Sequence, residues 1–330
     1  MLDIIITHYK EPWEVCRKLF LSLELQRVAD WGKIHVTVVN DGGHRLPEDK
    51  LAEMGYQVEQ LDIPHGGVSA ARNAGIEHAT GDWIMFCDCD DSFSNIYALM
   101  DIQNVLTKDS LEKYDLLWGM VAEEDCIQGA HLIYLMPKQK IFVFCHGKVY
   151  RRQFLIDEKI RFDTTLTFNE DSFFNAVIIA RTPYQRIGEI KSHAPVYAWI
   201  RRENSVTTSS NAPDDGAYCQ FRRNMMVTEE NRLHRARENY CGMVTRTAYD
   251  TFYMIFGRRI SAECTRKILD EFVPWMAARM DAFQKVEPEI LEKIREVSKL
   301  ELLESGEVVP DDHGIIAKWI TRITKGVTAG

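Results

Sequence analysis

The sequence of 330 residues lacks several features that define special classes of protein. No stretch approaches the roughly 18 consecutive apolar residues that a membrane-spanning helix requires. The N-terminal segment MLDIIITHYKEP has neither a basic region nor a cleavage site, so we expect no signal peptide. The ordinary composition, 45% hydrophobic and 27% charged, excludes a disordered or fibrous chain. We therefore expect a soluble protein of the cytoplasm.

The eight cysteines lack the spacing of a disulfide framework. Cys87 and Cys89 form one close pair, but the sequence has no second pair with which to build a zinc site. Reduced, buried thiols are the expected state of such cysteines in a cytosolic protein.

Positive charge is not in excess either, since 40 Lys and Arg stand against 49 Asp and Glu, a net charge of −9. Residues 215–330 hold 18 basic and 18 acidic side chains, so the negative charge lies on the N-terminal part. A net acidic chain is a poor candidate for binding nucleic acid.

The first 91 residues alternate between apolar runs and helical patterns. Apolar runs at 2–7, 34–39 and 83–87 predict strands, 58–63 is a further strand candidate, and helical patterns begin at Pro12 and cover 66–79. This order favours a parallel, doubly wound α/β sheet, in which ligands bind at the carboxyl ends of the strands. Because polar groups follow three of these strands, at Thr7 to Glu11, Asp41 and Asp88 to Asp91, we expect one shared crevice.

After about residue 109 the pattern predicts mixed strands at 116–121, 131–135 and 141–144, and helices at 151–159 and 171–180. The polar stretch 203–216 is the best internal boundary. We therefore predict an α/β domain over residues 1–210 and a mainly helical region over residues 211–330.

The sharpest chemical signal is Asp88-Cys89-Asp90-Asp91, directly after a predicted strand. Carboxylates at i and i+2 can converge on one Mg²⁺ or Mn²⁺ ion and leave positions open for phosphate oxygens. The structural alternative is a helix cap, with Asp91 or Ser92 before a helix that starts near Phe93.

Two further clusters carry candidate residues. The helix that begins after Gly66-Gly67 offers N–H groups to an anion, and Arg72 adds a bidentate phosphate partner, unless it lies on a solvated face. Glu170 and Asp171 open a helix, where they can act as a general base with a tuning partner or simply complement the helix dipole.

Five segments now occur in one order: VNDGG, GVSAARNAGIEHATGDWIMFCDCDD, HGKVYRRQFL, IRFDTTLTFNEDSFFN and VYAWIRRENSVT. The series resembles family 2 glycosyltransferases of the GT-A fold over about residues 1–210, especially bacterial-type enzymes that add sugars to surface polysaccharides. The resemblance implies a Rossmann-like mixed sheet flanked by helices. It also implies a nucleoside-diphosphate sugar as donor, most commonly a UDP-sugar, with Mn²⁺ or Mg²⁺.

The resemblance assigns roles to matching positions. The donor nucleotide would contact Thr7, His8, Tyr9, Glu11, Asp41, Arg72, Asp88, Arg201, Arg202 and Ser205, the last three in a loop that closes over the diphosphate. Asp90 would coordinate the metal, with Asp88 beside it. Asp171 would be the catalytic base, with Glu170 as its partner. The usual proline-rich opening is replaced here by Thr7-His8-Tyr9-Lys10, although Tyr9 still offers a ring to a base.

Several weaker signals can also be explained by an ordinary structural role. His146 and His193 are candidates for a further metal ligand, but a lone histidine is more often structural. Lys148 is a candidate for contact with the acceptor, and a solvated helix start is the alternative. Residues 216–262 interleave eight arginines with aromatics, a pattern of polyanion binding or of a helical subdomain with exposed arginines. The apolar stripe of 315–323 is suited to a membrane surface at its inner face or to packing within its own domain.

The sequence therefore predicts a metal-dependent, inverting glycosyltransferase that acts on a glycan or lipid-linked glycan. The cation and Arg72 would stabilise the leaving diphosphate, while Asp171 removes a proton from the acceptor hydroxyl. One displacement inverts the anomeric configuration. The alternatives are a glycosyltransferase that acts on modified DNA bases and a non-catalytic nucleotide-sugar-binding homologue. A homo-oligomer is also compatible with the sequence.

Overall fold

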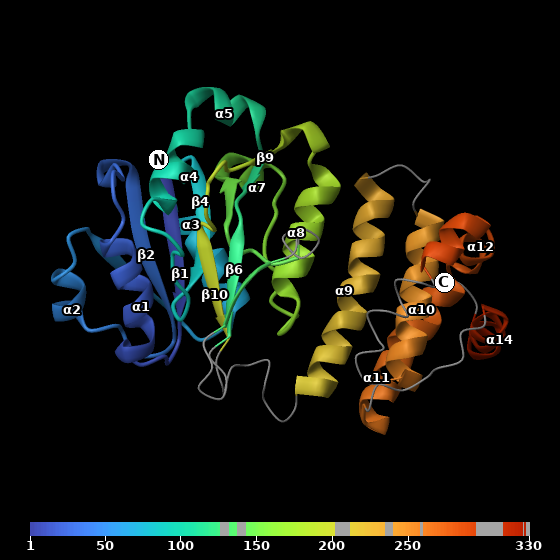
Figure 1. Cartoon of the computed structure of the whole chain (residues 1–330). Coiled ribbons are helices and arrows are strands. Elements are labelled where there is room, and N and C mark those ends of the chain that lie inside the picture. The colour runs from blue at the N-terminus through green and yellow to red at the C-terminus, as the bar shows by residue number, and fades with distance from the viewer. Residues whose placement is uncertain are drawn as a thin grey trace. The chain divides into compact units, whose positions relative to one another are not determined.

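The computed structural model describes residues 1–125, 132–136, 143–201, 212–234, 240–257, 260–294, 313–325 and 327. The chain divides into two compact units, Met1–Ser205 and Val206–Gly330 (Figure 1). The predicted boundary between residues 210 and 211 falls in 202–211, outside the described residues.

Within the described part of the first unit, seven strands form one sheet in the order β3-β2-β1-β4-β8-β5-β9. The strands are β1 (Leu2–His8), β2 (Ile34–Asp41), β3 (Val58–Ile63), β4 (Trp83–Asp88), β5 (Leu116–Trp118), β8 (Lys148–Arg151) and β9 (Ile187–Glu189). The first four run parallel, whereas β8 runs antiparallel to both β4 and β5. The predicted mixed α/β sheet is thus confirmed.

Strand β1 is buried on both faces because its side chains alternate between two cores. Ile4 and Ile6 join a core with α1 (Trp13–Glu24) and α4 (Ala98–Val105), whereas Ile5 joins a core with α3 (Val68–His78), α7 (Arg152–Asp157) and α8 (Glu170–Arg181). Figure 1 shows helices on both sides of the sheet. The unbroken apolar run of residues 2–7 reflects this double burial. The unit also has the short helices α2 (Glu48–Ala52) and α5 (Lys108–Lys113).

Helix α3 lies close against the sheet because its residues are small. A Cβ atom at Gly75 would stand 2.3 Å from Cγ2 of Ile5, closer than two carbons can approach. This close packing brings the N-terminus of α3 to the carboxyl ends of the strands, where the Gly66 and Gly67 N–H groups donate to Asp41.

A second sheet has the order β10-β6-β7, with β10 (Tyr197–Arg201), β6 (Val121–Asp125) and β7 (Leu132–Leu135). The single strand predicted at 116–121 is therefore wrong, because the chain leaves the first sheet at Gly119, whose N–H donates to the carbonyl of Gly147. In the predicted strand 141–144, residues 141 and 142 lie outside the described residues, and Phe144 lies in a bend before β8.

The described part of the second unit is helical, as predicted. Its helices are α9 (Ala212–His234), α10 (Tyr240–Gly257), α11 (Ala262–Ala277), α12 (Met280–Gln284) and α14 (His313–Thr324), with a further helical segment at 288–294. They enclose one core that includes Phe221, Tyr249 and Phe272. No helix in the described residues has both the length and the apolar character needed to cross a membrane.

The apolar stripe of α14 contributes to this core. Ile316 and Ile320 are fully buried, and the Trp319 ring stacks on Phe272 with ring centroids 5.8 Å apart. The structure therefore favours packing within the unit over the membrane-surface contact predicted for this helix. Most described aromatics of residues 216–262 are likewise core residues, so the interleaved arginine pattern reflects a helical subdomain.

Candidate active site

Strands β1, β2 and β4 have their carboxyl ends at the same edge of the sheet. Thr7 is paired in register with Val39 on one side and with Asp88 on the other. Its hydroxyl donates to Oδ1 of Asp88 at 3.0 Å. The polar groups expected at the strand ends therefore share one region, because parallel strands end at the same edge.

Arg72 links two of the predicted clusters. Its side chain is buried, with 4% exposed, which excludes the solvated-face alternative. Nη2 donates to Oδ1 of Asp88 at 2.9 Å, and Nη1 donates to Oε1 of Glu170 at 2.8 Å. Burial alone raises the pKa of Asp88, but Arg72 and His146 outweigh it and hold that pKa well below its usual range. Asp88 is therefore ionised in the folded protein.

Glu170 and Asp171 begin helix α8 and lie in two different environments. Burial and the Asp171 charge raise the pKa of Glu170 to about 7, and Arg72 limits the rise. Asp171 is half-buried and accepts a hydrogen bond from the backbone N–H of Ser172 at 2.6 Å. The Asp171 charge also favours the charged forms of Arg72 and His146.

Asp91 is not a helix cap, since α4 begins only at Ala98. Its side chain is 1% exposed and accepts hydrogen bonds from the Tyr197 hydroxyl at 2.8 Å and from the Ile200 N–H at 2.9 Å. Asp91 thus ties β10 to the Asp88–Asp91 turn. Burial raises the pKa of Asp91 well above its ordinary value, against the effect of His146.

His146 lies beside this turn in the structure, which could not be predicted from its position in the sequence. Its Nε2 is 3.3 Å from Oδ2 of Asp88 and 3.7 Å from Oδ2 of Asp91. Burial opposes protonation of the ring, but the hydrogen bond to Asp88 and the charge of Asp91 raise the pKa of His146 above its ordinary value. In the described residues, ligand atoms of Asp88, Asp91 and His146 all lie within 4.8 Å of one another and could hold a metal ion.

This donor set fits a divalent cation of the Mn²⁺ type, since two carboxylates and one imidazole supply hard and borderline ligands. It differs from the predicted set of Asp90, Asp88 and His193. Asp90 is half-buried in the same turn, and its charge acts on both Cys89 and Asp91. His193 is exposed and does not belong to the cluster of possible ligands in the described part of the chain.

The predicted base-binding end is organised around Asp41. Its carboxylate accepts hydrogen bonds from the N–H groups of Gly66 and Gly67, at 2.7 and 2.9 Å, and from Nδ1 of His65 at 2.9 Å. The His65 ring in turn stacks on Tyr9, with ring centroids 4.3 Å apart and planes inclined by 12°. Sequence reasoning missed His65, for which the only signal is its place before Gly66-Gly67.

The loop after β1 is held by its own hydrogen bonds. Glu11 Oε2 accepts from the Tyr9 N–H at 3.0 Å, and the buried His8 ring bridges Oδ1 of Asn40 and the Glu11 carbonyl. A Cβ atom at Gly43 would stand 1.4 Å from the Tyr9 carbonyl oxygen, so only glycine fits where the two loops meet. His8, Glu11 and Asp41 therefore shape the loop that presents Tyr9.

Of the remaining predicted contacts, Arg201 is the last residue of β10. Nη1 of Arg201 is 3.6 Å from Oε1 of Glu123 and 3.7 Å from Oδ2 of Asp125, both on β6. Arg202 and Ser205 fall outside the described residues.

Lys148 is not at a solvated helix start, the alternative that its sequence context favoured. It lies on β8, is completely buried, and donates to the Phe144 carbonyl. Burial lowers the pKa of Lys148 to about 8, against the charges of Cys145 and Asp171. A lysine in the short strand KVYR looks solvated from sequence because its burial depends on distant segments.

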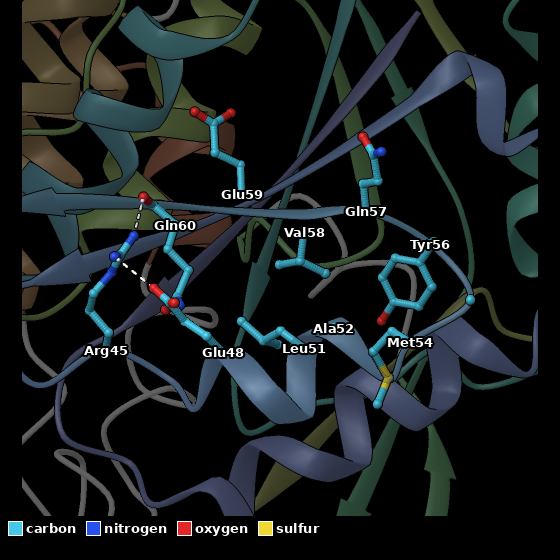
Figure 2. A pocket seen from close by; sticks show the side chains of 11 residues that line it. Arg45, Glu48, Leu51, Ala52, Met54, Tyr56, Gln57, Val58, Glu59 and Gln60 are labelled. Atoms are coloured by element: carbon cyan, nitrogen blue, oxygen red, sulfur yellow. Dashed lines mark hydrogen bonds and ion pairs between the residues drawn. The ribbon is translucent and has the colours of Figure 1, made fainter.

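A separate groove of about 850 Å³ runs beside the edge strand β3 and α2, and Figure 2 shows its lining. Its side chains include Arg45, Glu48, Leu51, Tyr56 and Val58. None of the predicted site residues lines this groove. Val58 begins β3, whereas ligands of parallel sheets bind at the carboxyl ends of strands, so we do not assign the active site to the groove.

Comparison with known proteins agrees with this geometry. Residues 3–109 match the model of glycosyl transferase family 2. The putative glycosyltransferase EpsH of Bacillus subtilis is 27% identical over 171 residues, 46% of this chain and 49% of EpsH. The poly(ribitol-phosphate) beta-N-acetylglucosaminyltransferase TarS of Staphylococcus aureus is 26% identical over 178 residues, 52% of this chain and 30% of TarS. The chain thus spans about half or less of the length of these curated relatives.

Solved structures show the same fold. S. aureus TarS 1–349 in complex with UDP-GlcNAc superposes with a TM-score of 0.65 at 20% identity, over 94% of this chain and 93% of that chain. The complex with UDP gives 0.64 at 16% identity, over 97% and 91%. The chain therefore shares the fold of these structures, and the GT-A fold predicted for the N-terminal unit is confirmed. The family whose model residues 3–109 match is the one that the five ordered segments predicted.

Proposed function

We propose that the chain transfers a sugar from a nucleoside-diphosphate sugar to a hydroxyl of a glycan or lipid-linked glycan, with inversion at the anomeric carbon. The Arg72 bridge is the observation that carries the proposal. It joins Asp88, at the end of β4, to Glu170, at the start of α8, through hydrogen bonds of 2.9 and 2.8 Å. Two acidic stretches far apart in sequence thus face one site.

Transfer leaves negative charge on the departing diphosphate. Arg72 is the proposed phosphate partner, because it is a buried cation beside the strand ends. A divalent cation, held by Asp88 with Asp90, Asp91 or His146, would neutralise further charge on the phosphates. Mn²⁺ is proposed in preference to Mg²⁺, because an imidazole nitrogen binds Mn²⁺ more readily than it binds Mg²⁺.

The acceptor hydroxyl must lose a proton as its oxygen attacks the sugar. Asp171 is the proposed base, and its neighbour Glu170 is held by Arg72. A single carboxylate that activates the acceptor gives one displacement, which inverts the anomeric carbon.

UDP-GlcNAc is the proposed first donor, since the crystallised relative TarS is in complex with UDP-GlcNAc. The stacked rings of Tyr9 and His65 offer a flat surface for the uracil, and Asp41 holds His65 in place. Thr7, His8 and Glu11 support this loop. Arg201, Arg202 and Ser205 are proposed to close over the diphosphate.

The alternatives receive less support. A DNA-modifying enzyme would need the aromatics of 216–262 to meet bases, but Phe221 and Tyr249 are fully buried. A non-catalytic homologue would not need Asp88, Asp90 and Asp171 together. Membrane-surface contact through α14 is not favoured, because Ile316 and Ile320 are buried.

A thermal-shift screen with product analysis tests the proposal. Nucleotide sugars are added with and without Mn²⁺, and we expect UDP-GlcNAc with Mn²⁺ to raise the melting temperature and to release UDP slowly. Asp90→Ala should lose the Mn²⁺-dependent part of the shift. Asp82→Ala, which changes an exposed acid before β4, is the matched control. If no nucleotide sugar shifts the melting temperature and none is hydrolysed, the proposal is refuted.

A further inference from the structure

We propose that four stacked rings beside the acidic cluster form an acceptor subsite that binds a pyranose ring of the glycan. The rings belong to Tyr197, His146, Trp199 and Phe144, and we call them the aromatic platform. This inference rests on the proposed function and deepens it, because it names the chemistry of the acceptor.

The rings of the aromatic platform are nearly parallel. His146 lies 5.4 Å from Tyr197 with planes inclined by 8°, and 6.1 Å from Trp199 with planes inclined by 19°. Phe144 lies 5.6 Å from Trp199 with planes inclined by 26°. Tyr197 and His146 are buried, whereas Trp199 and Phe144 are half-buried. The inner rings are thus covered by protein, and the outer rings keep surface for a ligand.

The inner end of the aromatic platform is fixed to the Asp88–Asp91 turn. The Tyr197 hydroxyl donates to Asp91 at 2.8 Å and accepts from the Asp88 N–H at 3.1 Å. His146 Nε2 is 3.3 Å from Asp88. Tyr197 and Trp199 are two residues apart on β10 and so share one face of the strand. A sugar on Trp199 would therefore lie next to the acidic cluster.

The order of the strands assigns the platform to the acceptor and not to the nucleotide. Strand β4 carries Asp88 and lies between β1 and β8. Tyr9 and His65 follow β1 and β3, on one side of β4. His146 precedes β8, on the other side. A donor whose base lies on Tyr9 and whose diphosphate reaches Asp88 leaves the platform side for the molecule that attacks.

The chemistry of the aromatic platform suits a pyranose. The C–H groups on one face of the sugar ring carry partial positive charge, which the negative face of an aromatic ring attracts. Glu123 and Arg201 add polar groups on neighbouring strands.

Saturation-transfer NMR with three probes tests the inference. Cellotriose and chitotriose present pyranose rings, and ribitol 5-phosphate presents an open polyol with a charge. We expect the wild type with UDP and Mn²⁺ to bind at least one trisaccharide, with saturation concentrated on the ring C–H protons. Trp199→Ala should weaken that binding about fivefold to tenfold, and Trp199→Phe should recover most of it.

Trp31→Ala is the matched control, since Trp31 is also half-buried and stacked, on Tyr56, but lies before β2 at the opposite edge of the sheet. It should leave trisaccharide binding unchanged, and UDP-GlcNAc affinity should be the same in all variants. If no trisaccharide binds, or if Trp199→Ala binds as well as the wild type, the aromatic platform is not the acceptor subsite. Binding of ribitol 5-phosphate alone, insensitive to Trp199→Ala, also overturns it. If the wild type does not bind UDP-GlcNAc, the proposed function is refuted instead.

Discussion

The two units of the chain bury polar groups in different ways. The first unit gathers charged or ionisable side chains at one edge of its sheet, namely Arg72, Asp88, Asp91, His146, Lys148 and Glu170. The second unit buries mainly neutral groups between α9 and α10. There the Thr228 and Thr247 hydroxyls lie 2.9 Å apart, and Asn224 donates to Asp250.

This difference separates function from structure. Removing an ion from water costs several kcal/mol, so a cluster of buried charges is a poor way to stabilise a fold. Neutral hydroxyl pairs cost far less, because each can satisfy the other. The charged edge of the first unit is thus the candidate for chemistry, and the contact between α9 and α10 is structural.

The largest effect is expected at Asp171. Asp171→Asn removes the proposed base with almost no change of shape and should lower sugar transfer by about a thousandfold. UDP-GlcNAc affinity, measured by calorimetry, should stay near that of the wild type. Asp157→Asn, an exposed acid in α7, is the control and should retain full activity. Full transfer by Asp171→Asn would show that another group is the base.

The next comparison is between a fully buried arginine and a half-buried one. Arg72→Met leaves Asp88 and Glu170 without their cation, so we expect the free energy of unfolding to fall by about 3 kcal/mol. Arg222→Met in the second unit breaks a looser pair with Glu271, at 3.6 Å, and should cost less than about 1 kcal/mol. Urea unfolding of both variants measures the contrast, and equal losses would remove the distinction between the units.

A pH series tests the charge of Glu170. Because its pKa is raised from 4.5 to about 7, the folded state holds the proton more tightly than the unfolded chain does. The stability gained from this proton is complete below about pH 4.5 and is lost as the pH rises through about 7. We expect the melting temperature of the wild type to fall across this range relative to Glu170→Gln, which cannot ionise. Parallel curves for the two proteins would contradict the raised pKa.

The smallest effect is expected in the second unit. Thr247→Val removes one hydroxyl of the pair with Thr228, and the unfolding free energy should fall by about 1 kcal/mol with no change in transfer. The double variant with Thr228→Val should lose more, because the Thr228 hydroxyl also donates to the Asn224 carbonyl at 2.8 Å. A loss of transfer activity in Thr247→Val would show that this contact also contributes to function.

The early part of the fold could be predicted because its signals are local. The apolar runs of β1, β2 and β4 and the small residues of α3 each lie in consecutive residues. The later strands could not be predicted as well, because the apolar run 116–121 divides between two sheets at Gly119, with β5 before it and β6 after it. That division is seen only in the structure, where the Gly119 N–H donates to the Gly147 carbonyl.

The candidate site was predictable as a set of acids but not as a set of contacts. Asp88 and Asp171 follow from their places at a strand end and a helix start. The burial of Arg72 depends on Glu170, which is far away in sequence, and the place of His146 depends on the antiparallel strand β8. His65 was missed because a histidine before Gly66-Gly67 has no pattern of its own.

A crystal structure of the protein with UDP and Mn²⁺ tests the central claim most directly. We predict a diphosphate next to Arg72 with the ion on the Asp88–Asp91 turn, the uracil against Tyr9, and Asp171 across an open space large enough for a hexose. A nucleotide bound elsewhere, for example in the groove beside β3, with Asp88 and Asp171 both remote from its phosphates, would contradict the proposed active site.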